Sequence, residues 1–363
     1  MRTLERITVT GYKSIRELRD FELGDLNVLI GANGAGKSNF LSLFVLLNHI
    51  ANRRLQFYIG KSDGADSLLY FGRKVTSETG IYLTLKKNDE LCTYQARLAS
   101  TDSNRFIFAE EKLGYFLPLF NQVEEVGLGV SQEETLLFSA VNSCSDFIIK
   151  SLSQWRVYHF QDTTESAKIK QNANIHENFS LRADAGNLPA FLYFLKYHRQ
   201  SYYKKILGTV RLVAPFFDDF LLEPMPENTK RIRLQWEHRK LGERFDISQL
   251  SDGTLRFICL TTLLLQPDPP SLIVIDEPEL GLHPAAIGLL VEMLRSVTTK
   301  SQVIISTQSV SMVNQFLPEE IIVVDREKDE SVFSRKSSKE LAMWLDEYSM
   351  GELWEMNVIG GRP

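Results

Sequence analysis

The chain has 363 residues, of which 44% are hydrophobic and 24% charged, and its formal net charge is −5. These values are typical of a folded protein of about two domains, and they exclude intrinsic disorder and a globally basic polyanion binder. Three scattered cysteines and six unclustered histidines predict neither a disulfide framework nor a metal site built on those side chains. The sequence contains no apolar run of about 18 residues and no apolar leader, so we expect a cytoplasmic protein without membrane contact.

The first 110 residues are predicted to form an N-terminal lobe of strands around one helix. Alternation of apolar and polar residues predicts a strand at 4–10, and a second strand is predicted at 26–30, directly before Gly31. Helical spacing of apolar residues follows at 40–50. Further strands are predicted at 81–85, 91–98 and 105–109, and we expect them to be antiparallel because short loops join them.

Three further segments complete the predicted organisation. Residues 111–205 are expected to be a mainly helical insertion, with a loop at 160–180 and a helix at 188–206. Residues 206–330 are expected to be a C-terminal lobe, followed by a tail at 331–363. In that lobe, strands are predicted at 232–236, 245–247, 272–275, 302–306 and 321–324, and helices at 253–265 and 284–296.

Residues 31–38 form a glycine-rich loop that is typical of phosphate binding. Gly31-Ala-Asn-Gly-Ala-Gly-Lys37-Ser38 matches G-x-x-x-x-G-K-[ST] in full, between a predicted strand and a predicted helix. The glycines let several backbone N–H groups point at one anion. Lys37 would reach the β- and γ-phosphates of ATP, and the Ser38 hydroxyl would coordinate Mg²⁺. The predicted ATP-binding residues of this loop are Asn33, Gly34, Ala35, Gly36, Lys37, Ser38 and Asn39.

Two acidic residues follow a predicted buried strand. Leu272-Ile-Val-Ile is a continuous apolar run that ends in Asp276 and Glu277, and ligands bind at the carboxyl ends of such parallel strands. Asp276 is predicted to hold Mg²⁺, and Glu277 to polarise the attacking water.

A third motif, Leu250-Ser-Asp-Gly-Thr254, opens a predicted helix with Ser251 as its N-cap. The positive end of the helix dipole suits a phosphate. An ordinary capped helix is the alternative, but the position of the motif between the loop and the two acids favours binding of ATP by Ser251 and Gly253.

The order and spacing of the three motifs resemble the ABC ATPases. More narrowly, Gly11-Tyr-Lys-Ser-Ile15, the loop at 31–38, the motif at 250–254 and Asp276-Glu-Pro-Glu-Leu-Gly-Leu-His-Pro284 resemble the RecF/SMC/OLD branch, and within it the short stand-alone ATPases. These are the non-transporter ABC ATPases of DNA repair and phage defence. The resemblance covers most of residues 1–325. It implies an α/β fold: an ABC-type P-loop ATPase head with an antiparallel β subdomain and an α-helical insertion.

The resemblance also implies a composite ATP site in a head-to-tail homodimer. ATP and Mg²⁺ held by Lys37, Ser38 and Asp276 of one subunit would be covered by Ser251 and Gly253 of the other, and hydrolysis would separate the two. Glu277 matches the catalytic base of the family.

Two family positions are altered or unassigned. Gln308 occupies the place where the family usually has a histidine, and a glutamine can donate a hydrogen bond to phosphate but cannot become cationic. We therefore expect slow hydrolysis that a partner stimulates. For the glutamine of the Q-loop, Gln95 is the first candidate and Gln122 the second.

Residues 185–217 contain no acidic residue but five cations and four tyrosines. Cations neutralise phosphates and tyrosines stack on bases, so Lys196, Arg199, Lys204 and Lys205 are candidate DNA contacts. An amphipathic helix whose tyrosines pack on the core is the alternative interpretation and stays open.

We therefore expect a nucleotide-gated dimerising switch in DNA repair or antiphage defence that controls a separate effector such as a nuclease. A RecF-like DNA clamp without an effector is one alternative. The energy subunit of a membrane transporter is another, and the residues 276–284 and Gln308 argue against it.

Overall fold

The computed structural model describes residues 3–87, 90–117 and 122–362. The chain divides into two compact units. Unit 1 comprises Met1–Val157, Pro270–Val274 and Lys300–Pro363, and unit 2 comprises Tyr158–Pro269 and Ile275–Thr299.

The first sheet of unit 1 is antiparallel, as expected from the short loops. Its strand order is β2-β1-β4-β5-β6-β7, and side chains along β4 alternate strictly between buried and half-buried over its first eight residues. One buried face per strand is what a two-residue period produces. The strands are β1 (Leu4–Tyr12), β2 (Ile15–Glu22), β4 (Glu78–Lys87), β5 (Glu90–Ser100), β6 (Phe106–Leu117) and β7 (Gln122–Gly129).

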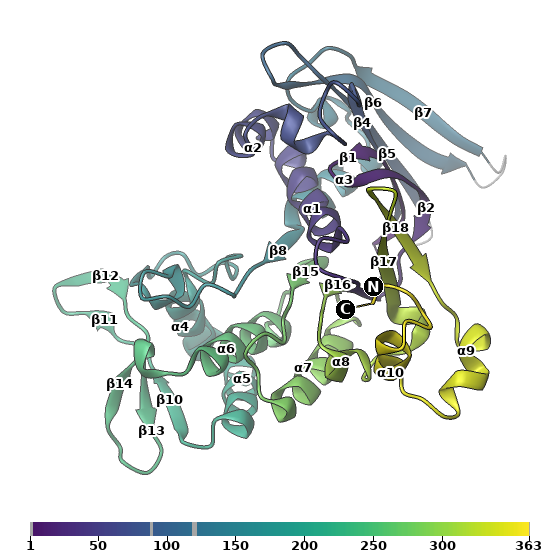
Figure 1. Cartoon of the computed structure of the whole chain (residues 1–363). Coiled ribbons are helices and arrows are strands. Elements are labelled where there is room, and N and C mark those ends of the chain that lie inside the picture. The colour runs from purple at the N-terminus through teal and green to yellow at the C-terminus, as the bar shows by residue number, and fades with distance from the viewer. Residues whose placement is uncertain (1–2, 88–89, 118–121, 363) are drawn as a thin grey trace. The chain divides into compact units, whose positions relative to one another are not determined.

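The second sheet carries the predicted phosphate-binding loop. Its order is β18-β17-β3-β16-β15-β8, and β3 pairs in parallel with both β16 and β17. All residues of β3 and β16 are buried, which agrees with their mainly apolar sequence. The purple N-terminal strands and the yellow-green β17 and β18 belong to the same unit (Figure 1). The strands are β3 (Leu26–Ile30), β8 (Arg156–Tyr158), β15 (Leu272–Asp276), β16 (Gln302–Ser306), β17 (Ile321–Glu327) and β18 (Glu330–Arg335).

The helix that follows the loop, α1 (Lys37–Ala51), packs against α3 (Ser143–Gln154). The Asn48 side chain of α1 donates hydrogen bonds to the carbonyls of Leu152, Ser153 and Trp155 at 2.9–3.1 Å, and the Trp155 ring packs on Phe44. The other helices of unit 1 are α2 (Leu55–Lys61), α8 (Val310–Val313), α9 (Ser338–Leu345) and α10 (Met350–Glu355), with short 3₁₀ turns at Ala65–Leu68, Leu137–Ser139 and Pro318–Glu320.

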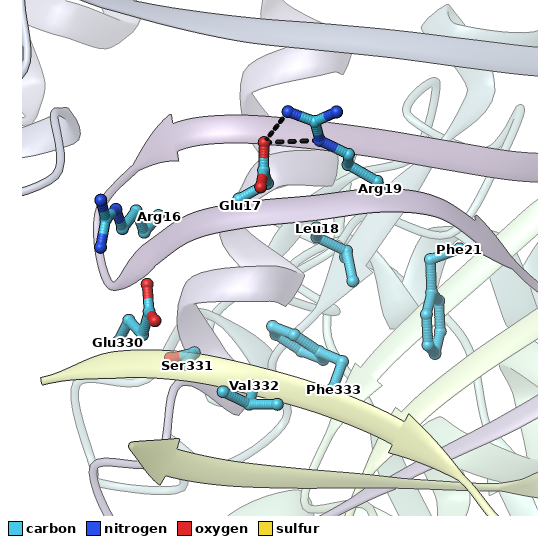
Figure 2. Close-up of a pocket in the computed structure, with 9 residues that line it drawn as sticks. All are labelled: Arg16, Glu17, Leu18, Arg19, Phe21, Glu330, Ser331, Val332 and Phe333. Carbon is cyan, nitrogen blue, oxygen red and sulfur yellow. Dashed lines mark hydrogen bonds and ion pairs between the residues drawn. The ribbon is translucent and has the colours of Figure 1, made fainter. Parts of the chain in front are cut away.

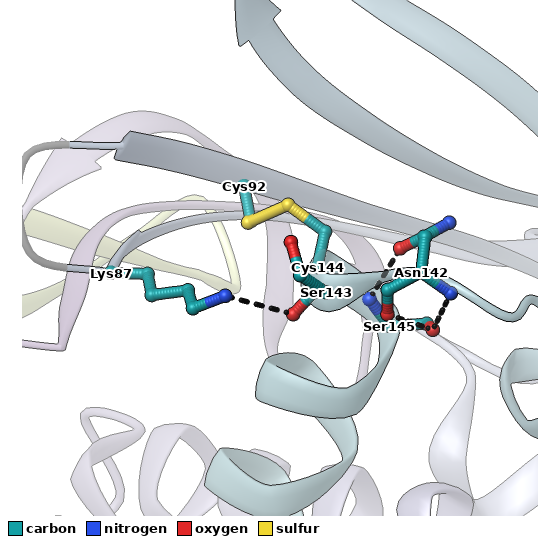
Figure 3. Close-up of a disulfide and its surroundings, with 6 residues drawn as sticks. All are labelled: Lys87, Cys92, Asn142, Ser143, Cys144 and Ser145. Carbon is teal, nitrogen blue, oxygen red and sulfur yellow. Dashed lines mark hydrogen bonds between the residues drawn. A yellow bond between two sulfur atoms is a disulfide. The ribbon is translucent and has the colours of Figure 1, made fainter.

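A disulfide joins β5 to the first turn of α3, which corrects the expectation from the cysteine pattern. Cys92 and Cys144 are 52 residues apart, and their Cα atoms lie 5.8 Å from each other. Figure 3 shows the bond beside Lys87, whose ammonium donates to the Ser143 carbonyl. The count and spacing of cysteines could not predict this pair, because only the packing of α3 on the sheet brings the two residues together. Cys259 is a buried free thiol.

The first part of the expected helical insertion is β structure instead. β6 continues to Leu117 and β7 follows, so helices begin only with α3. Acidic residues of this segment have partners on the sheet: Glu110 pairs with Arg97 and Lys112, and Lys112 also pairs with Glu125 across β6 and β7. Glu111 is fully buried and accepts hydrogen bonds from Tyr94, Gln132, Thr135 and the Leu136 amide.

Unit 2 contains the helices α4 (Leu188–His198), α5 (Gln200–Val213), α6 (Asp252–Leu265) and α7 (Pro284–Val297). The single helix expected at 188–206 is broken at Arg199, whose φ of −140° is not helical. α5 packs on both α4 and α6, and α6 packs on α7.

Two small sheets complete unit 2. Their orders are β10-β13-β14 and β11-β12-β9. Stacked and edge-to-face contacts among Phe217, Phe220, Trp236 and Phe245 form the core of the first. The strands are β9 (Ala173–Asn174), β10 (Phe217–Leu221), β11 (Pro224–Met225), β12 (Asn228–Ile232), β13 (Gln235–His238) and β14 (Arg244–Asp246), with 3₁₀ turns at Lys168–Lys170 and Ile247–Gln249. Over the described part of the chain, no helix is both long and apolar enough to cross a membrane.

Candidate nucleotide site

The loop at 31–38 connects β3 to α1 in unit 1, as its sequence predicts. Gly31 and Gly36 have φ values of +154° and +117°. A Cβ at Gly31 would lie 2.2 Å from the Val324 carbonyl oxygen, and one at Gly36 would lie 2.0 Å from the Ser331 Oγ. Both the backbone conformation and the close neighbours therefore require glycine at these two positions.

The side chains of this loop and the N-terminus of α1 are suited to bind a phosphate group. Lys37 is 6% exposed, and its ammonium donates to the carbonyl oxygens of Gly31 and Ala32 at 2.5 and 3.1 Å. Ser38 is exposed in the first turn of α1, which contains no acidic residue. Gly36 at the N-cap offers no side chain to the first amides of α1, so those N–H groups suit an anionic ligand.

The Gly11–Ile15 turn is bonded to the first turns of α1. Asn39, predicted to bind ATP, donates from Nδ2 to the Ser14 Oγ at 2.7 Å. Ser42, one turn later, contacts the Tyr12 hydroxyl at 3.0 Å and accepts from the Lys13 ammonium at 2.9 Å. Burial lowers the pKa of Lys13. The turn therefore fixes the position of the helix that begins with Lys37.

Gln308, at the position where the family usually has a histidine, follows the strand next to β3. Ser306 of β16 pairs with Leu29 of β3, and the Thr307 amide donates to the Leu29 carbonyl at 3.0 Å. Gln308 is exposed and follows β16 at the sheet edge where the loop follows β3.

The two Q-loop candidates lie in the other sheet. Gln95 is on β5, where its amide donates to Glu110 at 3.2 Å, and Gln122 begins β7. Neither belongs to the sheet that carries the loop.

Unit 2 contains the acidic pair and the third motif. Asp276 ends β15, and Glu277 follows with a φ of +46°. A left-handed conformation is unfavourable for glutamate, and such strain concentrates at functional sites. Both acids line a narrow pocket whose other residues are Phe160, Gln161, Arg256, Leu260, Ile275 and Pro278.

Gln161 and Arg256, which line this pocket and bond its backbone, were not predicted from the sequence. The Gln161 amide donates to the Asp276 carbonyl at 3.4 Å. The Arg256 guanidinium donates to the carbonyls of Phe160, Gln161 and Leu280 at 2.8–3.2 Å. Arg256 therefore ties α6 both to the segment at 160–161 and to the segment after Glu277. The only sequence signal for Gln161 is its place just after the short strand β8.

The third motif begins α6 as expected. The Ser251 hydroxyl accepts from the Thr254 amide at 3.2 Å, and Ser251 is exposed. A Cβ at Gly253 would lie 2.3 Å from the Gly281 carbonyl oxygen, so glycine is needed where α6 meets this turn. His283 caps α7 by accepting from the Ala285 amide, so the structure gives this residue a structural role.

The acid-free stretch at 185–217 is partly neutralised by acids that follow it. Lys196 pairs with Asp219 at 2.9 Å, and Arg211 pairs with Asp218 at 2.9 Å. Tyr203 is buried and donates to Asp219, and burial raises its pKa. Three candidate contacts are left exposed and, among the described residues, without an ion pair: Arg199, Lys204 and Lys205.

Comparison with known proteins identifies the family. The family model described as "AAA domain, putative AbiEii toxin, Type IV TA system" matches residues 26–314. An SMC head bound to the C-terminal winged-helix domain of ScpA matches at 13% identity with a TM-score of 0.61, over 94% of this chain and 99% of that chain. The Pyrococcus furiosus SMC head, with an extended coiled coil and bound to the C-terminal domain of ScpA, matches at 12% identity with a TM-score of 0.59, over 96% and 99% of the respective chains. Comparison with curated proteins found no match. The chain therefore belongs to the family of AAA domains that includes the putative AbiEii toxins, and it has the fold of an ABC-type, SMC-like P-loop ATPase head.

Proposed function

We propose that this protein is an ATP-hydrolysing switch that dimerises head to tail when ATP is bound. Lys37 holds the β- and γ-phosphates, and Ser38 and Asp276 are the residues that would hold Mg²⁺, which neutralises phosphate charge. Glu277 accepts a proton from the attacking water. Ser251 and Gly253 of a second copy of the chain complete the site.

One observation carries this proposal: both motifs that we propose to bind phosphate lie at helix N-termini with an exposed serine. Ser38 is in the first turn of α1, and Ser251 caps α6. A helix N-terminus binds anions through its free amides and its dipole. Two such ends from two subunits can hold one triphosphate between them, which supports a composite site.

Mixing two inactive variants tests the composite site. Lys37→Ala loses the phosphate contact, and Ser251→Arg blocks the exposed helix end, so each homodimer should be inactive. A heterodimer has one site that combines the intact loop of the Ser251→Arg chain with the intact Ser251 of the Lys37→Ala chain. We expect ATPase activity to reappear on mixing. Absence of recovery at every mixing ratio would contradict a site shared between subunits.

Gln308 is proposed to make hydrolysis slow. A glutamine can donate to a phosphate oxygen but cannot add the positive charge that histidine can. We expect slow turnover by the purified protein and faster turnover by Gln308→His. Rapid turnover by the wild-type protein alone would refute this role of Gln308.

The proposed role is antiphage defence or DNA repair through a separate effector such as a nuclease. The description of the matching family, which mentions a putative toxin and a toxin–antitoxin system, supports defence. The alternative is a RecF-like clamp that binds DNA through Arg199, Lys204 and Lys205, whose charges are exposed. An ATPase rate that a co-encoded protein changes and DNA does not would favour the switch. DNA stimulation that Lys204→Glu/Lys205→Glu abolishes would favour the clamp.

A further inference from the structure

We infer that Ser331, on the C-terminal hairpin of β17 and β18, positions the phosphate-binding loop for its ligand. The inference rests on the proposed function, because it assumes that this loop binds ATP. Ser331 is 2% exposed, and its hydroxyl donates to the Ala35 carbonyl at 2.5 Å. It lies outside residues 26–314, which the family model matches.

Ser331 is part of a chain of hydrogen bonds that spans the loop. The Asn39 amide donates to the Ser14 Oγ at 2.7 Å, and the Ser14 and Ser331 Oγ atoms are 2.7 Å apart. A hydroxyl has one proton, and the Ala35 carbonyl can only accept. The Ser331 hydroxyl is the donor toward both the Ser14 Oγ and the Ala35 carbonyl, so its single proton is shared between these two acceptors.

The geometry of one peptide group explains how this contact acts on the ligand site. The peptide that joins Ala35 to Gly36 is planar and trans, so its carbonyl and its N–H point in opposite directions. Ser331 holds the Ala35 carbonyl toward β18, and the Gly36 N–H therefore points away from β18. A loop of this type binds phosphate through such amides, so Ser331 fixes the direction of one of them.

The strand that carries Ser331 is itself held at both ends. At one end, the Ser331 amide donates to the Ser14 carbonyl at 2.8 Å. At the other, Arg335 donates to the Asn27 Oδ1 at 2.9 Å and contacts the Glu22 carbonyl. Between these anchors, β18 and β2 line a groove of about 550 Å³, with Leu18 and Phe333 facing each other (Figure 2). The backbone of β18 is thus a fixed support for the hydroxyl.

Other residues of the same C-terminal segment contact the loop. Arg326 of β17 donates to the Gly34 carbonyl at 3.2 Å. A Cβ at Gly361 would lie 3.3 Å from the Gly31 Cα, and the Gly361 amide donates to both carboxylate oxygens of Asp325 at about 3 Å. Residues 321–361 therefore brace the loop from the side of β17 and β18, and Ser331 makes the shortest of these contacts.

Ser331→Ala tests the inference, with Ser334→Ala as the matched control on the opposite face of β18. We would measure ATP affinity by calorimetry, KM and kcat in an ATPase assay, and the unfolding midpoint without nucleotide. Ser331→Ala is expected to weaken ATP binding roughly ten-fold, the equivalent of one hydrogen bond, and to raise KM more than it lowers kcat. Ser334→Ala is expected to match the wild type. Equal ATP affinity in the two variants would overturn the inference, even if Ser331→Ala lowered the unfolding midpoint.

Two further variants keep the result interpretable. Ser331→Cys fills the space with a weak donor, so it should also weaken ATP binding, and it replaces Ser331→Ala if that variant does not fold. Ser14→Ala should weaken binding less, because the Ser331–Ala35 hydrogen bond remains. The effects of Ser14→Ala and Ser331→Ala should be non-additive, because the two hydroxyls contact each other. Additive effects would contradict the chain of hydrogen bonds. If the wild-type protein does not bind ATP at all, the proposed function fails and this inference fails with it. If the wild-type protein binds ATP and Ser331→Ala binds it equally well, only the inference is overturned.

Discussion

Reduction of the Cys92–Cys144 disulfide should destabilise unit 1, and this prediction can be made quantitatively. The bond closes a chain segment with a sequence separation of 52 residues. The segment includes β6, β7 and the start of α3. Reduction breaks only the S–S bond and leaves both sulfur atoms in place, so it creates no cavity.

The expected loss follows from the entropy of the unfolded chain. A cross-link that closes a loop of about 50 residues lowers the entropy of the unfolded state by about 14 cal/mol/K, which corresponds to about 4 kcal/mol at 25 °C. With a urea dependence of about 2 kcal/mol/M, the unfolding midpoint of unit 1 should fall by about 2 M on reduction.

Urea unfolding with and without reductant measures the change, and thiol labelling reports the redox state. Under denaturing conditions, the oxidised protein should incorporate label only at Cys259, and the reduced protein at all three cysteines. In the folded protein Cys259 should react slowly, because it is buried and burial raises its pKa.

Two variants serve as controls for this measurement. Cys92→Ala/Cys144→Ala should not respond to reductant, whereas Cys259→Ala keeps the disulfide and should respond as the wild type does. The reasoning is refuted if labelling confirms the oxidised state but reductant leaves the midpoint unchanged. It is also refuted if protein purified without reductant shows three free thiols.

Three further predictions concern single side chains. Arg256→Ala should lower the stability of unit 2 by about 3 kcal/mol in denaturant unfolding, because three carbonyls lose a charged donor; an unchanged midpoint would contradict this role. Gly253→Ala should reduce ATPase activity about 100-fold, since the added Cβ forces α6 about 1 Å away from Gly281, and full activity would show that this contact is unimportant. Glu111→Gln should destabilise unit 1 by about 3 kcal/mol, because an amide group replaces one acceptor oxygen among four donors; loss of less than about 1 kcal/mol would argue against a buried, fully bonded carboxylate.

The parts of the fold that were predicted correctly have a strong local signal. The residues 26–30 and 302–306 are mainly apolar and form β3 and β16 with the predicted bounds. The glycine loop and the N-cap at Ser251 were identified because their backbone geometry depends on a few neighbouring residues. The ABC-type fold class is confirmed by the likeness to SMC heads.

The features that were missed depend on contacts between distant residues. The strand β18 has the sequence Glu-Ser-Val-Phe-Ser-Arg, which shows no clear alternation, and its pairing with β17 defines it. Ser331 and Ser14 are 317 residues apart, and Arg256 contacts carbonyls that no sequence pattern marks. The segment at 111–130 was expected to be helical, whereas it forms strands whose acidic residues are accommodated by cross-strand ion pairs.

The central claim is that ATP binding joins two copies of the chain, and the solution mass of Glu277→Gln tests it most directly. This variant should bind ATP but not hydrolyse it, because it lacks the carboxylate that we propose accepts the proton of the attacking water. Light scattering should show a mass near 41.5 kDa without nucleotide and about twice that value with ATP and Mg²⁺. Adding Lys37→Ala to the same chain should abolish the increase. A mass that is the same with and without ATP, also in the presence of DNA and of a co-encoded protein, would contradict the nucleotide-gated dimer.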